Sequence, residues 1–424
     1  MPDGDAPAAA PGRDTARAVA ATAIGNGLMI YDFTVYSFSA VFIGQHFFPA
    51  GNALASLLMA LATFGAGFFM RPLGALVIGS LADRRGRKAA MLASIAIMTL
   101  GTGIIAFTPS YATIGVGATW LIVLARLMQG FAAGGEIGAA SAMLMELASR
   151  ERRCYLVSWR AASQGLSAMA GALVGALGVA LLTPSQMQDW GWRVSFMLGL
   201  PIGLVGWYIR RHLTEAPMRA NPRAPLARVL RQHRRTLWFG TLAMAAPTAS
   251  IYIVVFYMPT YLVRTLHMAP SISLLSASLA GAMIFLATPA LALVADRQRR
   301  RKPIQYATLL CCAILVYPAF HVLTHAAGEG LALAVIVAYA VLALSNGGAS
   351  GTMLLEAFPR QHRALGMGII YSMGSALFGG FSPLIVTWLI AATGNPMAPA
   401  WYLLAALATS LYALRRFPDT VEAQ

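Results

Sequence analysis

The sequence predicts an all-α membrane protein with 12 transmembrane helices in two pseudo-symmetric six-helix bundles. Three observations lead to this prediction: an apolar composition, a series of long apolar stretches, and a pair of loop motifs that occurs twice. Hydrophobic residues make up 58% of the 424-residue chain and charged residues only 11%, whereas a typical soluble domain has about 25% charged residues. This composition suits the hydrocarbon core of a bilayer.

The apolar stretches are long enough to cross a bilayer, which needs roughly 20 residues per helix. Their apolarity is continuous and does not alternate every second residue, so it predicts helices and not the strands of a membrane barrel. The expected spans lie near residues 18–43, 54–80, 88–107, 118–147, 154–182 and 193–210, and then near 237–263, 271–294, 304–325, 330–355, 364–391 and 398–414.

The polar segments divide the chain into two bundles. We expect residues 1–17 to form a disordered cytoplasmic lead and residues 18–210 to form the amino-terminal bundle. A cytoplasmic linker at 211–236 precedes the carboxy-terminal bundle at 237–414, and 415–424 form a short tail. The lead lacks a basic region followed by an apolar core, so it does not read as a signal peptide.

The basic residues indicate the orientation of the chain. Of the 31 Lys and Arg residues, 26 fall in segments that lie on one face if both termini are inside. The positive-inside rule therefore places both termini and the central linker in the cytoplasm. The net charge of +16 does not indicate nucleic-acid binding, because no basic patch is interleaved with aromatic residues. We expect contact with anionic lipids instead.

Two loop motifs of the first half recur in the second half. An aspartate followed by basic residues occurs after the second span, at Asp83, and again after the eighth span, at Asp296, 213 residues later. Glu146 after the fourth span is matched by Glu356 after the tenth span, 210 residues later. Two matches at nearly the same offset indicate a duplicated six-helix unit. Transporters built in this way bind their substrate near the middle of the membrane, between the repeats.

The segment Gly79–Lys88 reads GSLADRRGRK and resembles the loop signature of the major facilitator superfamily. The resemblance extends from the first span to the last. It implies the major facilitator fold and alternating access, with Asp83, Arg84 and Arg87 in a gate on the cytoplasmic side. In such a latch the aspartate faces the amino terminus of a helix in the carboxy half, where the helix dipole favours an anion. The other candidate gating residues are Glu146, Asp296 and Glu356.

A narrower resemblance, to the metabolite:proton symporter family, rests on short motifs in several spans. These are Gly25-Asn26 with Tyr31-Asp32-Phe33, Phe69–Gly74, Arg126–Phe131 with Gly134–Glu136, Ser158-Trp159 with Ala162–Gln164, and Phe378–Leu384. Members carry citrate, tricarballylate, 2-oxoglutarate, shikimate, or proline and betaine. The short tail resembles the carboxylate branch, closest in pattern to citrate and tricarballylate symporters. The resemblance implies a bacterial-type inner membrane, and we expect a monomer.

Five charged residues fall deep inside the expected spans of the first half: Arg71, Arg126, Arg160, Asp32 and Glu136. Each charge at the centre of a bilayer costs at least about 2.5–3.5 kcal/mol, so we expect these residues to act in transport. Internal pairing is the competing explanation, with Arg71 on Asp32 and with Arg126 or Arg160 on Glu136. Such pairing leaves one positive charge uncompensated. A bound anion would supply the missing negative charge, and arginine grips a carboxylate with two hydrogen bonds.

The candidate substrate-binding residues are the three arginines with Gln129, Gln164, Asn26, Tyr31, Tyr36, Asn346 and Tyr371. The carboxy half lacks buried charge, and Tyr252, Tyr257 and Ser372 are further candidates there to hydrogen-bond substrate oxygens. Asp32 and Glu136 are the candidate proton-coupling residues, because burial and a nearby arginine shift the protonation of a carboxyl group in opposite directions.

Two positions depart from the pattern of the metabolite:proton symporters. Met29 stands where many relatives carry a glutamate, which removes one candidate proton carrier. Arg160 stands where many relatives carry a glutamine. The additional cation fits either a more highly charged substrate or a local partner for Glu136, and the sequence leaves both open.

Together these residues predict a secondary transporter that carries a small di- or tricarboxylate, such as citrate or tricarballylate, with protons. One alternative is a neutral or zwitterionic solute such as shikimate, proline or betaine, and another is carboxylate transport without proton coupling. An enzyme is not expected, because no metal-binding or nucleophile motif lies within the spans. No metal and no cofactor are expected.

Overall fold

The computed structural model describes residues 13–85, 87–211, 226–298, 300–325 and 328–418, and this part of the chain is helical without strands. Ten helical segments in it are long and apolar enough to cross a membrane. The other two expected spans, the sixth and the twelfth, are also helical. Most of the expected lead, linker and tail lie outside the described residues.

The first half contains five long spanning helices and a sixth span in two pieces. These are α1 (Arg13–Phe47), α2 (Ala53–Arg85), α3 (Arg87–Phe107), α5 (Val116–Leu147) and α6 (Arg153–Leu181), followed by α8 (Trp192–Met197) with α9 (Gly199–Arg211). Short elements connect them: α4 (Tyr111–Ile114), the 3-10 helix η1 (Arg150–Arg152), α7 (Pro184–Gln186) and the π-helix η2 (Met187–Gly191).

The second half contains more interrupted spans than the first. It begins with α10 (Leu226–Gln232), and its seventh span consists of α11 (Arg234–Ala243), α12 (Ala245–Ser250), the π-helix η3 (Ile251–Tyr257) and α13 (Met258–Arg264). The remaining elements are α14 (Pro270–Asp296), α15 (Lys302–His325), α16 (Glu329–Leu344), α17 (Gly347–Glu356), the 3-10 helix η4 (Arg360–His362), α18 (Arg363–Phe378), α19 (Ser382–Thr393) and α20 (Ala398–Arg416).

Prolines lie at several of these interruptions. Pro247 lies in α12 and Pro259 lies at the start of α13. A proline has no amide hydrogen and cannot continue the hydrogen-bond ladder of a helix. The eleventh span breaks before Pro383 for the same reason. The irregular seventh span matters for the site, because π-helical segments often occur where a helix carries functional side chains.

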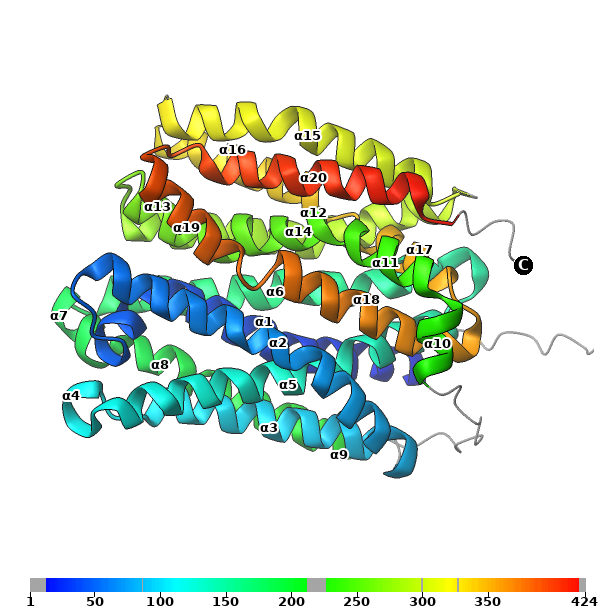
Figure 1. Cartoon of the computed structure of the whole chain (residues 1–424), viewed down its shortest axis with the longest axis horizontal. Helices are drawn as coiled ribbons and strands as arrows, with labels where there is room; N and C mark the ends of the chain where they lie inside the picture. The colour runs from blue at the N-terminus through cyan, green and yellow to red at the C-terminus, as the bar shows by residue number, and fades with distance from the viewer. Residues whose placement is uncertain (1–12, 86, 212–225, 299, 326–327, 419–424) are drawn as a thin grey trace, which may run out of the picture.

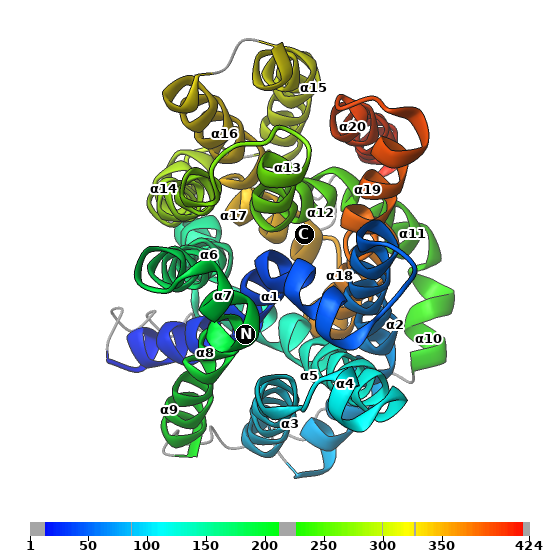
Figure 2. The same cartoon turned by 90° about the vertical axis from the view of Figure 1, so that its left-hand side faces the viewer.

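Figure 1 shows the helices running roughly parallel to the long axis of the molecule, with the early helices in one layer and the late helices in the other. The end-on view in Figure 2 places α3 and α9 on one side and α15 and α16 on the other, with α1 near the centre. The end that carries α10, the arginine-rich η1 and the carboxyl end of α14 is called the basic end below.

The two halves meet where α6 packs along α14 and where α2 and α5 pack along α18. Gly165 of α6 and Gly281 of α14 face each other at the first of these contacts. A Cβ atom added to either glycine would lie 2.6 Å from the carbonyl oxygen of the other. The absence of side chains therefore lets the two backbones approach closely, as small residues do between membrane helices.

We expect the substitution Gly281→Ala to weaken this contact between the halves. The new methyl group has to push rigid backbone aside, and overpacking of this kind costs about 1–3 kcal/mol in the free energy of unfolding. The measurement is the melting temperature of the purified protein in detergent. Gly117→Ala in α5 is the matched control, because a Cβ atom there meets nothing within 4 Å. Equal melting temperatures for both variants would contradict the assignment.

Candidate functional site

A buried ion pair lies inside the first half and joins α1 to α5. Nη1 of Arg126 lies 3.2 Å from Oδ2 of Asp32, and both side chains are almost completely buried. Thr102 of α3 donates to the other carboxylate oxygen at 2.9 Å, and Gln129 accepts from Arg126 at 2.6 Å. Gln129 in turn donates to Thr102 at 3.2 Å. This network corrects the pairing considered from the sequence, because Arg126, not Arg71, is the partner of Asp32.

Arg71 of α2 bridges the two halves of the molecule. Its Nη1 donates to Oγ of Ser375 in α18 at 2.9 Å, and its Nη2 lies 3.5 Å from the hydroxyl of Tyr252 in η3. The guanidinium also lies over the ring of Phe68, 4.0 Å from the centroid. Arg71 is 1% exposed, and among the described residues no carboxylate lies within 4.0 Å of it. A full positive charge is therefore buried against neutral groups.

Arg71 and Arg126 share one aromatic side chain. The ring of Phe33 lies 5.3 Å from the guanidinium carbon of Arg71 and 5.0 Å from that of Arg126. Aromatic rings attract cations through their negative faces, by about 2 kcal/mol or more when the pair is desolvated. This attraction offsets only part of the cost of burying two cations beside the single carboxylate of Asp32.

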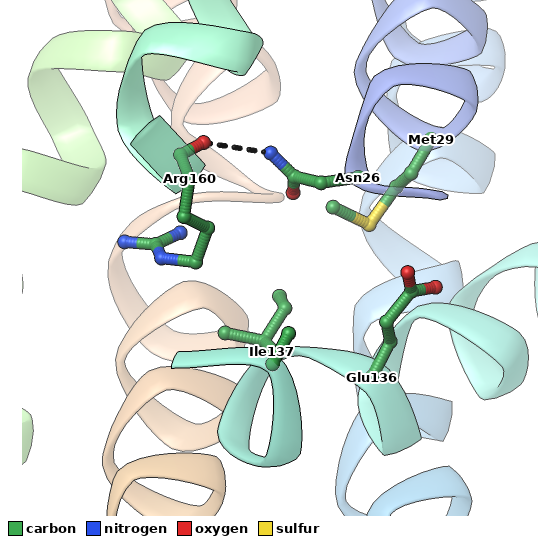
Figure 3. Close-up of a pocket in the computed structure, with 6 residues that line it drawn as sticks. Asn26, Met29, Glu136, Ile137 and Arg160 are labelled. Atoms are coloured by element: carbon green, nitrogen blue, oxygen red, sulfur yellow. Dashed lines mark hydrogen bonds between the residues drawn. The ribbon is translucent and has the colours of Figure 1, made fainter. Parts of the chain in front are cut away.

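Arg160 of α6 is the third buried arginine and lies beside two cavities. The smaller cavity has a volume of about 10 Å³ and is also lined by Asn26, Met29 and Glu136. In Figure 3 the guanidinium of Arg160 points away from Glu136, and the structure gives no ion pair between these two residues. Nε and Nη1 of Arg160 have no hydrogen-bond partner among the described residues, although Arg160 is only 6% exposed. The sequence left open whether Arg160 pairs with Glu136, and here it does not.

The larger cavity has a volume of about 80 Å³ and lies between α6 and the helices of the second half. Among the described residues that line this cavity, Arg160 alone has a charged side chain. Its guanidinium carbon lies 5.3 Å from the ring centroid of Tyr371, whose hydroxyl lies 3.5 Å from Nε2 of Gln164. Asn346 also lines this cavity, together with Gln305 and Thr308. Four of the expected binding residues, Arg160, Gln164, Asn346 and Tyr371, thus meet at one place.

Three other expected binding residues hold helices together instead. Asn26 donates to the backbone carbonyl of Arg160 at 2.9 Å, as Figure 3 shows. The hydroxyl of Tyr31 donates to the carbonyl of Ser195 at 2.7 Å, and that of Tyr36 to the carbonyl of Ala60 at 3.0 Å. These side chains satisfy backbone groups of neighbouring helices, and their part in substrate binding stays a prediction.

The second copy of the loop motif connects the two halves at the basic end. Asp296, at the end of α14, accepts hydrogen bonds from the amides of Cys154 and Tyr155 at 2.8 and 2.9 Å. These amides belong to the first turn of α6, where unpaired N–H groups and the helix dipole favour a carboxylate. An ion pair between Arg153 and Glu356, at 3.3 Å, crosses the same gap.

The structure describes the other candidate gating residues only in part. Asp83 and Arg84 lie in the last turn of α2 and Arg87 begins α3, but their side chains lie outside the described part of the chain. The expected latch of Asp83 therefore stays a prediction. Glu146, near the end of α5, is exposed.

A model of the Major Facilitator Superfamily matches residues 22–352 of the chain. The chain belongs to the major facilitator superfamily. It is similar to the citrate-proton symporter of Klebsiella pneumoniae, with 36% identity over 403 residues that cover 92% of this chain and 90% of the relative. It is also 31% identical over 410 residues to the proline/betaine transporter of Escherichia coli (strain K12), covering 92% of this chain and 80% of the relative.

The fold agrees with that of a solved major facilitator structure. The partially occluded, inward open xylose transporter XylE from E. coli superimposes with a TM-score of 0.79 at 18% identity, over 96% of this chain and 99% of the other. At this identity the likeness concerns the fold alone. The expected superfamily and fold are thereby confirmed, and the chain is a membrane transporter and not an enzyme.

Several polar residues at the site of this major facilitator protein were not predicted from the sequence. Thr102 and Ser375 contact the buried charges directly, and Gln305 and Thr308 line the larger cavity. A hydroxyl group in a membrane helix usually bonds a carbonyl of its own helix, so a serine or threonine alone carries little signal. Gln305 could have been predicted more readily, because the side chain of a glutamine in an apolar span needs a hydrogen-bond partner.

A pair of histidines connects the start of the second half to the loop before α18. Nε2 of His233, between α10 and α11, lies 3.0 Å from Nδ1 of His362 in η4. His362 is 4% exposed, and its Nε2 has no partner in the part of the chain that the structure describes. Desolvation, and then the neighbouring His362, lower the pKa of His233. The contact is therefore compatible with two neutral imidazoles and not with two charged ones.

This histidine pair predicts a loss of stability in mild acid. A histidine with a lowered pKa in the folded state contributes its full stability above its unfolded pKa, about 6.5, because the unfolded chain binds protons first as the pH falls. The contribution decreases from that pH downwards, through the lower folded pKa. We expect the melting temperature to fall between pH 7.5 and pH 5, and His233→Phe to flatten this dependence.

The control for this prediction is His321→Phe, which removes an exposed histidine of α15. It should leave the pH dependence of the melting temperature unchanged. If His233→Phe has the same pH profile as the unmodified protein, the histidine pair does not contribute to stability.

Proposed function

We propose that the chain is a proton-coupled symporter that carries a small di- or tricarboxylate, such as citrate or tricarballylate, by alternating access. The observation that supports this most strongly is the presence of two buried arginines, Arg71 and Arg160, without a carboxylate partner among the described residues. A substrate with at least two carboxylates supplies one negative charge to each guanidinium. A neutral substrate leaves both charges uncompensated.

The positions of the two arginines favour one shared ligand. Arg71 contacts Ser375, and Arg160 lies against Tyr371. Tyr371 and Ser375 are four residues apart in α18, so they lie one above the other on the same face of that helix. The two guanidiniums therefore approach neighbouring turns of one helix from the opposite half. An anion held between them links the halves and favours the state in which both are close together.

Asp32 is the proposed site of proton coupling. It compensates the charge of Arg126, and its oxygens accept from Arg126 and Thr102. A proton on Asp32 removes this compensation and leaves Arg126 as a third unpaired cation beside Arg71. The pocket then attracts an anion more strongly, so proton binding and substrate binding support each other, as symport requires. Glu136, beside the smaller cavity, is the second proposed proton carrier.

The orientation and the relatives support this proposal. The Arg and Lys residues at the basic end support an orientation with this end and both termini in the cytoplasm, and we propose a bacterial-type inner membrane as the location. A relative with 36% identity is a citrate-proton symporter. We propose that the protein acts as a monomer, since the site is assembled within one chain.

The similarity to a proline/betaine transporter favours a second candidate substrate, a zwitterion with a single carboxylate. Such a ligand needs one arginine, and its own cation is repelled by the other. The two candidates therefore differ in how many of the arginines they require.

We expect proteoliposomes containing the protein to accumulate labelled citrate or tricarballylate when an inward proton gradient is imposed. Arg160→Gln and Arg71→Gln should each raise the KM for the carboxylate by about tenfold or more, because a hydrogen bond to a charged group is worth about 1.5–3 kcal/mol. Arg264→Gln is the control, because Arg264 is exposed at the end of α13.

Three outcomes would contradict parts of this proposal. Equal accumulation with the gradient collapsed would exclude proton coupling. No uptake of any carboxylate in a panel would exclude the substrate class. Proline or betaine uptake that survives one of the two arginine substitutions would favour the zwitterion.

A further inference from the structure

The larger cavity has two walls of different chemistry. On one side α6 contributes Arg160 and Gln164, and on the other side α15 and the segment before α17 contribute Gln305, Thr308 and Asn346. The second wall is polar but carries no charge. The arginines account for the carboxylates of an anion, and this neutral wall is not used in the proposed function.

Asn346 lies at the N-cap position of α17, where an asparagine side chain normally caps the helix. It is the residue before the first turn of α17, and asparagine is favoured there because its side chain accepts a hydrogen bond from a free amide of the helix. Asn346 makes no such bond. Its Nδ2 instead donates to Oε1 of Gln305 at 2.9 Å and to Oγ1 of Thr308 at 3.2 Å. The side chain is thus held toward α15 at the expense of the helix cap.

Close packing fixes this arrangement beside Arg160. A Cβ atom on Gly347, the next residue, would lie 2.6 Å from the Cβ atom of Ala161, which follows Arg160 in α6. The turn that carries Asn346 is therefore pressed against the turn of α6 that carries the arginine. Gln305 is 6% exposed, Asn346 and Thr308 are half-buried, and all three line the cavity.

Asn346, Gln305 and Thr308, here called the amide cluster, offer a ligand both a hydrogen-bond donor and a hydrogen-bond acceptor. The two N–H groups of Asn346 and the side-chain oxygen of Gln305 are used within the cluster. The side-chain oxygen of Asn346 remains to accept a bond, and the side-chain N–H groups of Gln305 remain to donate. A hydroxyl group, which donates and accepts, matches this pair. A carboxylate only accepts and is bound better by Arg160.

We propose that Asn346, Gln305 and Thr308 form a specificity subsite that binds an uncharged hydroxyl group on the carbon chain of the substrate. This inference rests on the proposed transport of a carboxylate and adds to it that a hydroxylated acid is preferred. The cavity volume of about 80 Å³ fits this role, since a cavity of about 150 Å³ holds a benzene-sized molecule. The subsite holds the part of the substrate that carries the hydroxyl group, and the carboxylate groups extend toward the arginines.

The test compares citrate with tricarballylate, which has the same three carboxylates but lacks the hydroxyl group. In proteoliposomes the unmodified protein should show a kcat/KM for citrate that is about fivefold to tenfold higher, the value of one neutral hydrogen bond. Asn346→Leu, which has nearly the same shape, should bring this ratio close to one, because it lowers kcat/KM for citrate more than for tricarballylate. Thr308→Val, a smaller change, should lower the ratio in the same direction.

Thr324→Val is the matched control, because Thr324 lies in the same helix, α15, and does not line the cavity. It should leave the ratio unchanged. Equal values for the two acids in the unmodified protein would overturn the subsite, as would variants that lose both acids equally. If neither acid is transported by the unmodified protein, the proposed function itself fails, so the two failures are distinguishable.

Discussion

The arrangement of this transporter depends on the cost of placing positive charge inside a membrane. Arg71, Arg126 and Arg160 are all at least nine-tenths buried, and one carboxylate, that of Asp32, forms an ion pair with one of them. The protein partly offsets this cost with the ring of Phe33 and with neutral hydroxyl groups. The remaining imbalance of charge is the basis for the proposal that the transported ligand is an anion.

The same charges connect substrate binding to the movement of the halves. Arg71 reaches across to Ser375 and Tyr252, and Asp296 reaches across to the first turn of α6 at the basic end. The first contact involves groups that a substrate anion would engage, whereas the second is distant from them. A ligand that contacts both halves at the arginines would therefore favour the arrangement in which the halves are close together.

Much of the fold could be predicted from the sequence, because apolar stretches and basic loops carry strong and independent signals. The buried charges were also predictable, since Asp32 or Arg126 stands out in an apolar helix. Their pairing was not, because it depends on the rotation of each helix about its axis, which composition does not determine. For the same reason the hydrogen bond of Tyr31 to a neighbouring backbone was not predicted, and Ser375 was missed because serine is common at helix contacts.

The central claim is that the two arginines without carboxylate partners hold a multiply charged anion. The most direct measurement is the melting temperature of the purified protein with mono-, di- and tricarboxylates of similar size, because a ligand that binds only the folded state raises its stability by mass action. The account predicts that the increase grows with the number of carboxylates and that Arg160→Gln reduces it for the di- and tricarboxylates. An increase that is independent of carboxylate number, or one that is larger with betaine than with any of the acids, would contradict it.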